Sequence, residues 1–162
     1  MSKVYPHILE LEREIRENPE QWRSLVLTNG CFDLLHVGHV RYLQTAKSLG
    51  KTLVVGVNSD LSVSQIKPQK NGFPLRPILE ESQRAEVLAA LTVVDAVVIF
   101  SETTAISLIQ HLKPDIYAKG GDYTIETLPE AKTVQSYGGS IELIQIEVPT
   151  STSDVIGKIL GG

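Results

Sequence analysis

The chain has 162 residues, 42% apolar and 21% charged, which is typical of one globular domain with a hydrophobic core. A net charge of −4 provides no basic field for a nucleic-acid backbone, so we expect no nucleic-acid partner. The single cysteine, Cys31, excludes an internal disulfide, and no Cys/His cluster has zinc-site spacing. With no signal-peptide pattern and no apolar run long enough to span a bilayer, the sequence favours a cytoplasmic location and no membrane partner.

The first part of the chain, residues 1–23, is predicted to be a helical extension that packs on the domain formed by residues 24–162. In residues 8–18, Ile8, Leu11 and Ile15 line one face of a helix, and Pro19 ends it. We expect this face to pack on its own domain, which is commoner than binding a partner.

The stretch from residue 25 to residue 50 predicts a buried strand followed by a helix. Residues 25–27 form an apolar run too short for a helix, and Asn29-Gly30 breaks the strand. His36 and His39 follow at the point where the helical spacing begins. A helix N-terminus offers free N–H groups and a positive dipole end, and Gly38 lets a ligand approach the backbone. The histidines therefore predict a phosphate site, although two loop histidines are often ordinary residues.

Residues 52–58 predict a second buried strand, which makes a right-handed βαβ unit with the first. At its end, Ser59 or Asp60 can simply cap the helix of residues 61–66. Residues 67–79 then predict a loop, because three prolines and an Asn-Gly pair exclude regular structure. All its charges are positive, which favours a phosphate-binding role for Lys67 and Arg76. Lys70 is equally well explained as a solvated surface residue.

Residues 80–91 predict a helix in which Glu81 and Arg84 are close enough to form a salt bridge. Strands are predicted at residues 95–100, 115–118 and 141–146, with helices at residues 102–112 and 126–137. Lys119-Gly-Gly-Asp122 follows the fourth strand, as either a structural turn or a substrate contact. The hydroxyl residues Ser151-Thr-Ser153 precede a last helix, as ordinary N-caps or as a second anion site.

Five strands that alternate with helices predict an α/β fold, a single domain built on a doubly wound parallel sheet. Ligands of such folds bind outside the carboxyl edge of the sheet. The sequence has no Walker loop and no Gly-x-Gly-x-x-Gly, so a dinucleotide oxidoreductase is not favoured.

Residues 28–39, Thr-Asn-Gly-Cys-Phe-Asp-Leu-Leu-His-Val-Gly-His, resemble the signature of the cytidylyltransferase-like nucleotidyltransferases. The resemblance covers about residues 24–160. Within this superfamily, the chain most resembles the adenylyltransferase domain of ADP-heptose synthases. It continues in Asn58-Ser-Asp60, Arg84-Ala-Glu-Val-Leu-Ala-Ala-Leu91, Lys119-Gly-Gly-Asp-Tyr123 and Ser151-Thr-Ser153. The chain departs from the family in a longer cationic loop and in a serine at position 153. It also lacks the arginine that glycerol-3-phosphate cytidylyltransferases carry near residues 147–149.

The resemblance implies a Rossmann-like sheet of order 3-2-1-4-5 and the transfer of AMP from ATP to a sugar 1-phosphate. The expected acceptor is D-glycero-β-D-manno-heptose 1-phosphate, and the products are an ADP-sugar and pyrophosphate. The nucleophile is already ionised, so catalysis is positioning and charge neutralisation. Mg²⁺ is expected with ATP, together with a homodimer and a sugar kinase on a separate chain. Two alternatives stay open, a cytidylyltransferase for a polyol or amino-alcohol phosphate and a nucleotide-binding module without turnover.

The site residues follow from the matched motifs. His36, His39, Lys67 and Arg76 are expected to act on the reacting phosphates, and Asp33 to orient a histidine or to hold Mg²⁺. The nucleotide is expected to contact Thr28, Asn29, Gly30, Cys31, Phe32, Gly38, His39, Arg84, Lys119, Gly120, Asp122, Ser151, Thr152 and Ser153. The acceptor is expected to contact Asp33, Asn58, Asp60, Lys70 and Tyr123.

Overall fold

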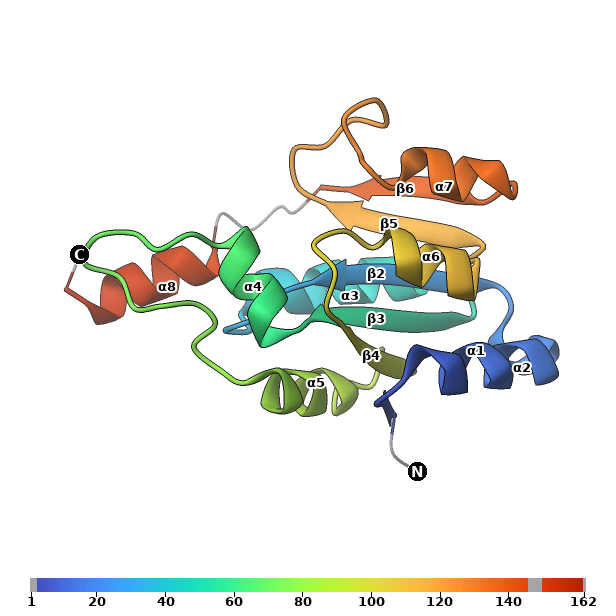
Figure 1. The fold of residues 1–162 in the computed structure, drawn as a ribbon, viewed down its shortest axis with the longest axis horizontal. Coiled ribbons are helices and arrows are strands. Elements are labelled where there is room, and N and C mark those ends of the chain that lie inside the picture. Colours follow the sequence, from blue (N-terminus) through green and yellow to red (C-terminus); the bar gives the residue numbers. More distant parts are fainter. Residues whose placement is uncertain (1–2, 146–149, 162) are drawn as a thin grey trace.

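A computed structural model describes residues 3–145 and 150–161, which form one parallel sheet with helices on both faces (Figure 1). The order of the strands is β1-β4-β3-β2-β5-β6, and every neighbouring pair is parallel. Their bounds are Val4–Tyr5 (β1), Leu25–Gly30 (β2), Thr52–Asn58 (β3), Ala96–Phe100 (β4), Ile116–Gly120 (β5) and Ser140–Ile144 (β6). The predicted order 3-2-1-4-5 is therefore confirmed for β2 to β6, but the prediction of five strands is wrong.

The additional strand, β1, comes from the segment that the sequence assigned to a purely helical extension. Val4 pairs with Val97, and the Val97 N–H donates to the Lys3 carbonyl at 2.8 Å. Two residues are too few to show the alternation that identifies a strand, so this pairing depends on the open edge of β4 rather than on the local pattern. Residues 3–23 thus contribute a strand to the sheet as well as packing on it.

The two faces of the sheet follow from the alternation of side chains along each strand. On β2, Leu25 and Leu27 pack with α1 (Ile8–Glu17), α6 (Ile106–Leu112) and α7 (Ala131–Ser136). Val26 points to the other face, where α3 (Val37–Ser48) and α5 (Glu81–Ala89) lie. The central strand β3 is buried along its whole length, because helices cover it on both sides. The doubly wound arrangement is confirmed.

Several helices differ at their ends from the predicted ranges. A short second helix, α2 (Pro19–Trp22), begins at the proline that ends α1. The helix expected from residue 126 begins only at Ala131, because Thr124 and Thr127 close a turn before it, with Thr124 N–H donating to Thr127 Oγ1 at 2.9 Å. Similarly, α6 begins at Ile106 rather than at residue 102.

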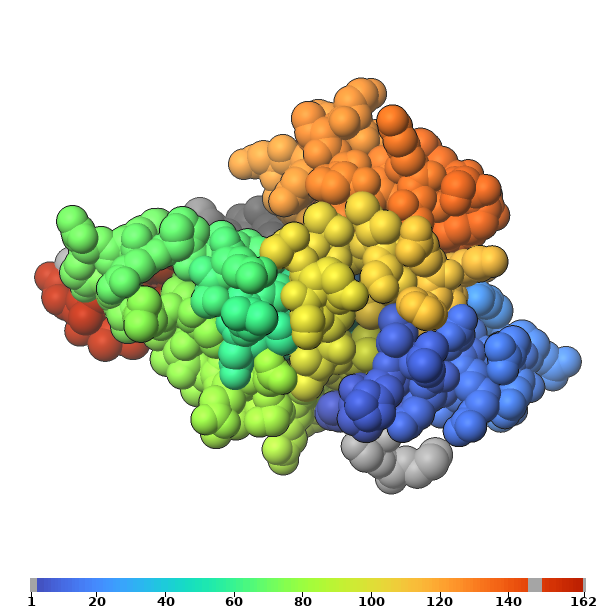
Figure 2. Space-filling model, in the orientation of Figure 1, coloured from blue at the N-terminus to red at the C-terminus, as the bar shows by residue number. Residues whose placement is uncertain are grey.

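Two helices and one loop lie beyond the carboxyl ends of the strands. Helices α4 (Asp60–Ile66) and α8 (Thr152–Ile159) stand at this end of the sheet, with the loop of residues 67–79 beside α8 (Figure 1). Figure 2 shows the same loop and α4 as one surface beside α8. Residues 146–149, where the family's late arginine is missing, lie outside the described residues. No helix in the described part of the chain is long and apolar enough to cross a membrane.

Candidate active site

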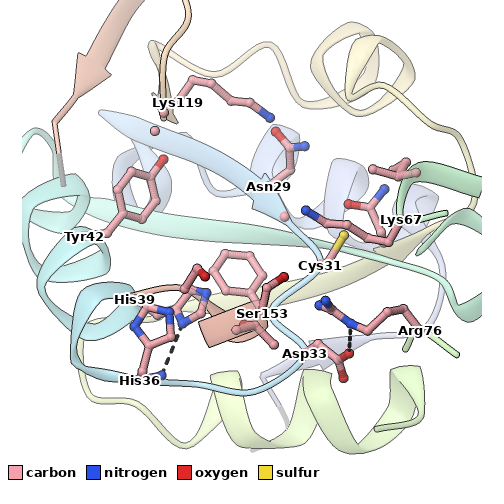
Figure 3. Close-up of a pocket in the computed structure, with 18 of the residues that line it drawn as sticks. Asn29, Cys31, Asp33, His36, His39, Tyr42, Lys67, Arg76, Lys119 and Ser153 are labelled. Carbon is pink, nitrogen blue, oxygen red and sulfur yellow. Dashed lines mark hydrogen bonds and ion pairs between the residues drawn. The ribbon is translucent and has the colours of Figure 1, made fainter. Parts of the chain in front are cut away.

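The carboxyl ends of β2, β3 and β5 meet the starts of α3 and α8 around a pocket of about 450 Å³ (Figure 3). Most of the residues expected at a site are brought together here, although they come from five distant parts of the chain. The expected residues that line the pocket are Asn29, Gly30, Cys31, Phe32, Asp33, His36, His39, Asn58, Lys67, Arg76, Lys119, Gly120, Tyr123, Ser151, Thr152 and Ser153.

The start of α3 is closed by the two histidines themselves. The Gly38 N–H donates to His36 Nδ1 at 3.1 Å, and the His36 N–H donates to His39 Nδ1 at 3.2 Å. Each Nδ1 accepts a backbone proton, so each neutral ring carries its own proton on Nε2. The ring centroids are 4.0 Å apart, and both rings line the pocket. The cap therefore leaves two adjacent N–H donors for a ligand.

His39 is held in this neutral form by its surroundings. Burial, and to a smaller extent the neighbouring His36, lower its pKa to about 4. The Phe32 ring packs against the His39 ring at 5.6 Å between centroids. Phe32 has φ 50°, a left-handed backbone conformation that is costly for an aromatic residue. This turn carries the chain from the end of β2 toward the histidines.

The start of α8 faces the same pocket with hydroxyl residues. Ser151 Oγ accepts the Asp154 N–H at 3.1 Å, and an Asp154 carboxylate oxygen accepts the Ser151 N–H at 3.0 Å. Thr152 Oγ1 donates to the Leu34 carbonyl at 3.1 Å, which ties α8 to the segment before α3. The expected N-cap role of Ser151 is confirmed, and the proton of the Thr152 hydroxyl is directed at the protein rather than at the pocket.

Two cations of the loop of residues 67–79 reach the pocket. Lys67 and Arg76 line it, whereas Lys70 is exposed and lies away from it. Arg76 Nε donates to Asp33 Oδ2 at 2.7 Å (Figure 3). Both cations therefore lie at the pocket, although the carboxylate of Asp33 balances the charge of Arg76.

The predicted Mg²⁺ ligand, Asp33, does not fit that role in this arrangement. Its Oδ1 accepts the N–H groups of Ile78 and Leu79, each at 2.9 Å, and its Oδ2 accepts Ile78 N–H at 2.8 Å besides Arg76 Nε. A carboxylate has about four acceptor positions, and these four contacts use them. No group of three or more His, Cys, Asp or Glu residues able to hold a metal occurs in the described ranges.

The end of β5 lines the pocket opposite the histidines. Burial lowers the pKa of Lys119, and Glu130 opposes this shift. The Lys119 ammonium lies 5.4 Å from the centre of the Tyr123 ring, within cation–π range. The adjacent Gly121 has φ 96°, a conformation that favours glycine, so the expected turn is present. Beside it, Tyr117 Oη donates to Asn29 Oδ1 at 2.5 Å, which leaves the Asn29 amide as a donor.

Arg84 is the expected site residue whose position differs most from the expectation. It is buried and does not line the pocket. It pairs with Asp60 at 2.8 Å rather than with Glu81, and it also donates to the Cys31 and Asn58 carbonyls at 2.6 and 2.8 Å. Arg84 therefore holds the ends of β2 and β3 together beneath the pocket.

Other expected contacts also lie outside the pocket lining. Thr28 is buried and shares a hydrogen bond of 2.6 Å with the Tyr42 hydroxyl, and Gly38 supplies its N–H to His36. Asp60 faces Arg84, whereas Lys70 and Asp122 are exposed. Asn58 does line the pocket, but its side chain is largely engaged within the protein, because its amide donates to Ser62 Oγ at 2.7 Å.

The sequence reasoning missed several lining residues. They are Tyr42, Ile66, Thr103, Gly121 and Thr150. Tyr42 stands one helical turn after His39, so the spacing of α3 placed it on the same face. Thr103 follows the carboxyl end of β4, which is the edge where ligands of this fold bind. The helical spacing of α3 and the position of Thr103 at a strand end therefore predict both residues at the pocket.

Paired imidazole donors, loop cations and two helix starts around one pocket define the class of α/β proteins that bind nucleotide phosphates at the carboxyl edge of a parallel sheet. The family described as Cytidylyltransferase-like matches residues 27–158, and the chain belongs to this family.

The relatives of the chain are consistent with this family. The bifunctional protein HldE of Syntrophotalea carbinolica is 49% identical over 153 residues, which cover 94% of this chain and 29% of that protein. The HldE of Geobacter metallireducens is 52% identical over 85% of this chain and 27% of its own length. The chain thus spans less than a third of these relatives. The crystal structure of a lipopolysaccharide core biosynthesis protein from Thermoplasma volcanium superposes with a TM-score of 0.61 at 28% identity, covering 77% of this chain and 97% of that one.

Proposed function

We propose that this chain is an adenylyltransferase that transfers AMP from ATP to a sugar 1-phosphate, with D-glycero-β-D-manno-heptose 1-phosphate as the acceptor. An oxygen of the sugar phosphate attacks the α-phosphorus of ATP. The bond from that phosphorus to the bridging oxygen of the β-phosphate breaks, and pyrophosphate leaves with the electron pair. The products are an ADP-sugar and pyrophosphate.

The observation that carries the proposal is the pair of Nε2–H donors of His36 and His39. The acceptor phosphate is already an anion, so the reaction needs no Ser, Cys or Lys nucleophile. It needs donors that meet the charge developing on the phosphoryl oxygens, in a fixed orientation. The backbone N–H groups that bind both Nδ1 atoms fix the rings in that orientation before ATP arrives.

The remaining residues of the pocket fit the rest of the two substrates. Lys67 and Arg76 lie where they can contact the transferring phosphates, and the start of α8 offers Ser151 and Ser153 to the far end of the triphosphate. Lys119 and Tyr123 form the opposite wall for the nucleoside or the acceptor.

Mg²⁺ is expected to enter with ATP and to be held mainly by phosphate oxygens and water, as this ion usually is. When bound, it supplies positive charge to the phosphates. We assign it no ligand in this chain, because the carboxylate of Asp33 is already satisfied.

The heptose acceptor is supported by two findings. Lys119-Gly-Gly-Asp-Tyr123 resembles the ADP-heptose synthases, and the bifunctional HldE proteins are about half identical over most of this chain. A sugar kinase must supply the 1-phosphate for this reaction. We also propose a homodimer, and light scattering of the purified chain measures its mass directly.

A pyrophosphate-release screen tests the proposal. ATP, CTP, GTP and UTP are each combined with heptose 1-phosphate, other sugar 1-phosphates, glycerol 3-phosphate and phosphocholine. We expect the highest kcat/KM for ATP with heptose 1-phosphate. Faster turnover of CTP with a polyol or amino-alcohol phosphate would identify a cytidylyltransferase. Nucleotide binding without pyrophosphate release for any acceptor would identify a module without turnover.

A further inference from the structure

The buried carboxylate of Asp33 joins two segments that are more than 40 residues apart. Its side chain is completely shielded from solvent, although it lies between the end of β2 and the histidines. The Asp33 carboxylate accepts hydrogen bonds from Arg76 Nε at 2.7 Å and from the N–H groups of Ile78 and Leu79 at 2.8–2.9 Å. One side chain thus anchors the far limb of the cationic loop to the strand that carries the site.

The geometry of this bond determines which part of Arg76 is available to a ligand. Asp33 takes the inner nitrogen, Nε, while the two terminal nitrogens lie at the other end of the planar guanidinium. The plane and the Nε direction are fixed together, because the group is rigid. The Arg76 side chain keeps 12% of its surface exposed, and the residue lines the pocket.

We propose that Asp33 is a positioning residue that holds the Arg76 guanidinium toward the transferring phosphates, and that it is not a Mg²⁺ ligand. The inference rests on the proposed nucleotidyl transfer for its catalytic consequence. Its structural part, the anchoring of the loop, is independent of which reaction takes place.

A double-mutant cycle tests the catalytic part. We expect Arg76→Ala to lower kcat/KM by about 100- to 1,000-fold, as the loss of a transition-state donor does. Asp33→Asn should lower it by about 100-fold through misplacement of the guanidinium. In the double variant the two effects should not multiply, because both remove the same contact. Arg76→Lys should resemble Arg76→Ala, since one ammonium cannot both meet Asp33 and reach the phosphates.

The Mg²⁺ dependence separates this role from metal coordination. In Asp33→Asn, the Mg²⁺ concentration for half-maximal rate should equal that of the unaltered protein. A requirement raised tenfold or more, with activity restored at high Mg²⁺, would overturn the proposal. Losses that multiply in the double variant would also overturn it.

Limited proteolysis tests the anchoring without any assay of turnover. Lys67 and Arg76 are each followed by proline, so Lys70-Asn71 is the bond of this loop that trypsin cleaves readily. We expect mass spectrometry to show several-fold faster cleavage there in Asp33→Asn, and ATP to protect the unaltered protein but not the variant. Glu142→Gln, an exposed acid-to-amide change on β6, is the matched control and should cleave at the original rate.

The outcomes of the kinetic tests and of the proteolysis are distinguishable. If no substrate pair gives turnover, the proposed reaction fails, while proteolysis and ATP protection still judge the role of Asp33. If Asp33→Asn loses activity but its loop is cleaved at the original rate, the positioning role is overturned. Should Asp33→Asn not fold, Arg76→Ala removes the side-chain contact while the Ile78 and Leu79 N–H groups keep theirs. Cleavage at Lys70-Asn71 must then still be faster than in Glu142→Gln, and an unchanged rate would overturn the anchoring.

Discussion

The starts of α3 and α8 face one pocket and are closed by the same kind of reciprocal bond, but with opposite chemistry. In α3 both partners are imidazoles, His36 and His39, and their Nδ1 atoms serve the cap. In α8 the partners are Ser151 and Asp154, and a carboxylate accepts the N-cap N–H. The start of α3 thus keeps two N–H donors for a ligand, whereas the start of α8 already binds the carboxylate of Asp154.

This difference indicates which phosphates of a triphosphate bind at the start of α3 and which bind at the start of α8. A carboxylate in the first turn partly offsets the positive end of the helix dipole, so α8 attracts an external anion less strongly than α3. The cap of α3 adds no negative charge. The transferring phosphate, on which charge develops, is expected at α3, and the leaving pyrophosphate at α8. Five measurements test this difference between the two helix starts.

The largest effect is expected at His39. His39→Ala removes one donor and the acceptor of the His36 N–H, so kcat should fall by about 100- to 1,000-fold while the fold is retained. His7→Ala is the matched control, because His7 is exposed and lies at the start of α1. Steady-state kinetics and circular dichroism decide the point. If His39→Ala kept nearly the original turnover, the transferring phosphate could not be assigned to the start of α3.

Thr152 links the two helix starts and should show the next largest effect. Thr152→Val keeps the shape but deletes the hydrogen bond to the Leu34 carbonyl. A loss of about 0.5–1.5 kcal/mol of positioning energy corresponds to an increase of up to about tenfold in the KM for ATP. Thr103→Val, a pocket threonine after β4, is the comparison variant. An equal change in both variants would show that the link between α8 and α3 has no special role.

Asp154 should have a smaller effect of opposite sign. Asp154→Asn keeps an acceptor for the Ser151 N–H but removes the charge at the start of α8. A helix-terminal charge is worth about 0.3–1 kcal/mol, so ATP should bind about two- to fivefold more tightly at low salt. Titration calorimetry at two salt concentrations measures this, since salt should reduce the gain. Weaker binding would mean that the carboxylate supports the site.

The smallest change is expected in the protonation state of His39 as the pH is varied. Its pKa is lowered to about 4 from 6.5, so the ring should stay neutral, with the proton on Nε2, between pH 8 and pH 5.5. Nitrogen NMR of the imidazoles checks both statements.

The same shift has a consequence for folding. The unfolded chain binds the His39 proton at about pH 6.5 and the folded chain only near pH 4, so the free energy of unfolding should fall as the pH decreases through this window. His39→Gln should lose less stability on acidification than the unaltered protein. A titration of His39 near pH 6.5 in the folded protein would contradict both expectations.

The sequence predicted those features that depend on strong local patterns. Buried strands such as β3 and the strand–helix junction at His36 followed from apolar runs and helical spacing, and β2 to β6 have the order implied by the family. The expected break at Asn29-Gly30 was wrong, because β2 continues through both residues. What it could not show were contacts between distant segments. Arg84 was within reach of Glu81 on its helix, yet Asp60 and the carbonyls of two strand ends bind it. Asp33 carried an open role, and only the fold shows that its carboxylate binds Arg76 and the N–H groups of Ile78 and Leu79.

The pairing of β1 with β4 has a consequence for self-association. The family match begins at residue 27, after β1 and α1. A chain trimmed just before β2, at residue 24, would expose the N–H and C=O groups of β4 at Val97 and would uncover the face of α6 on which Leu11 now packs. Open edges of this kind are templates for strand addition between molecules. We therefore expect β1 to shield the edge of β4 from strand addition by a second molecule.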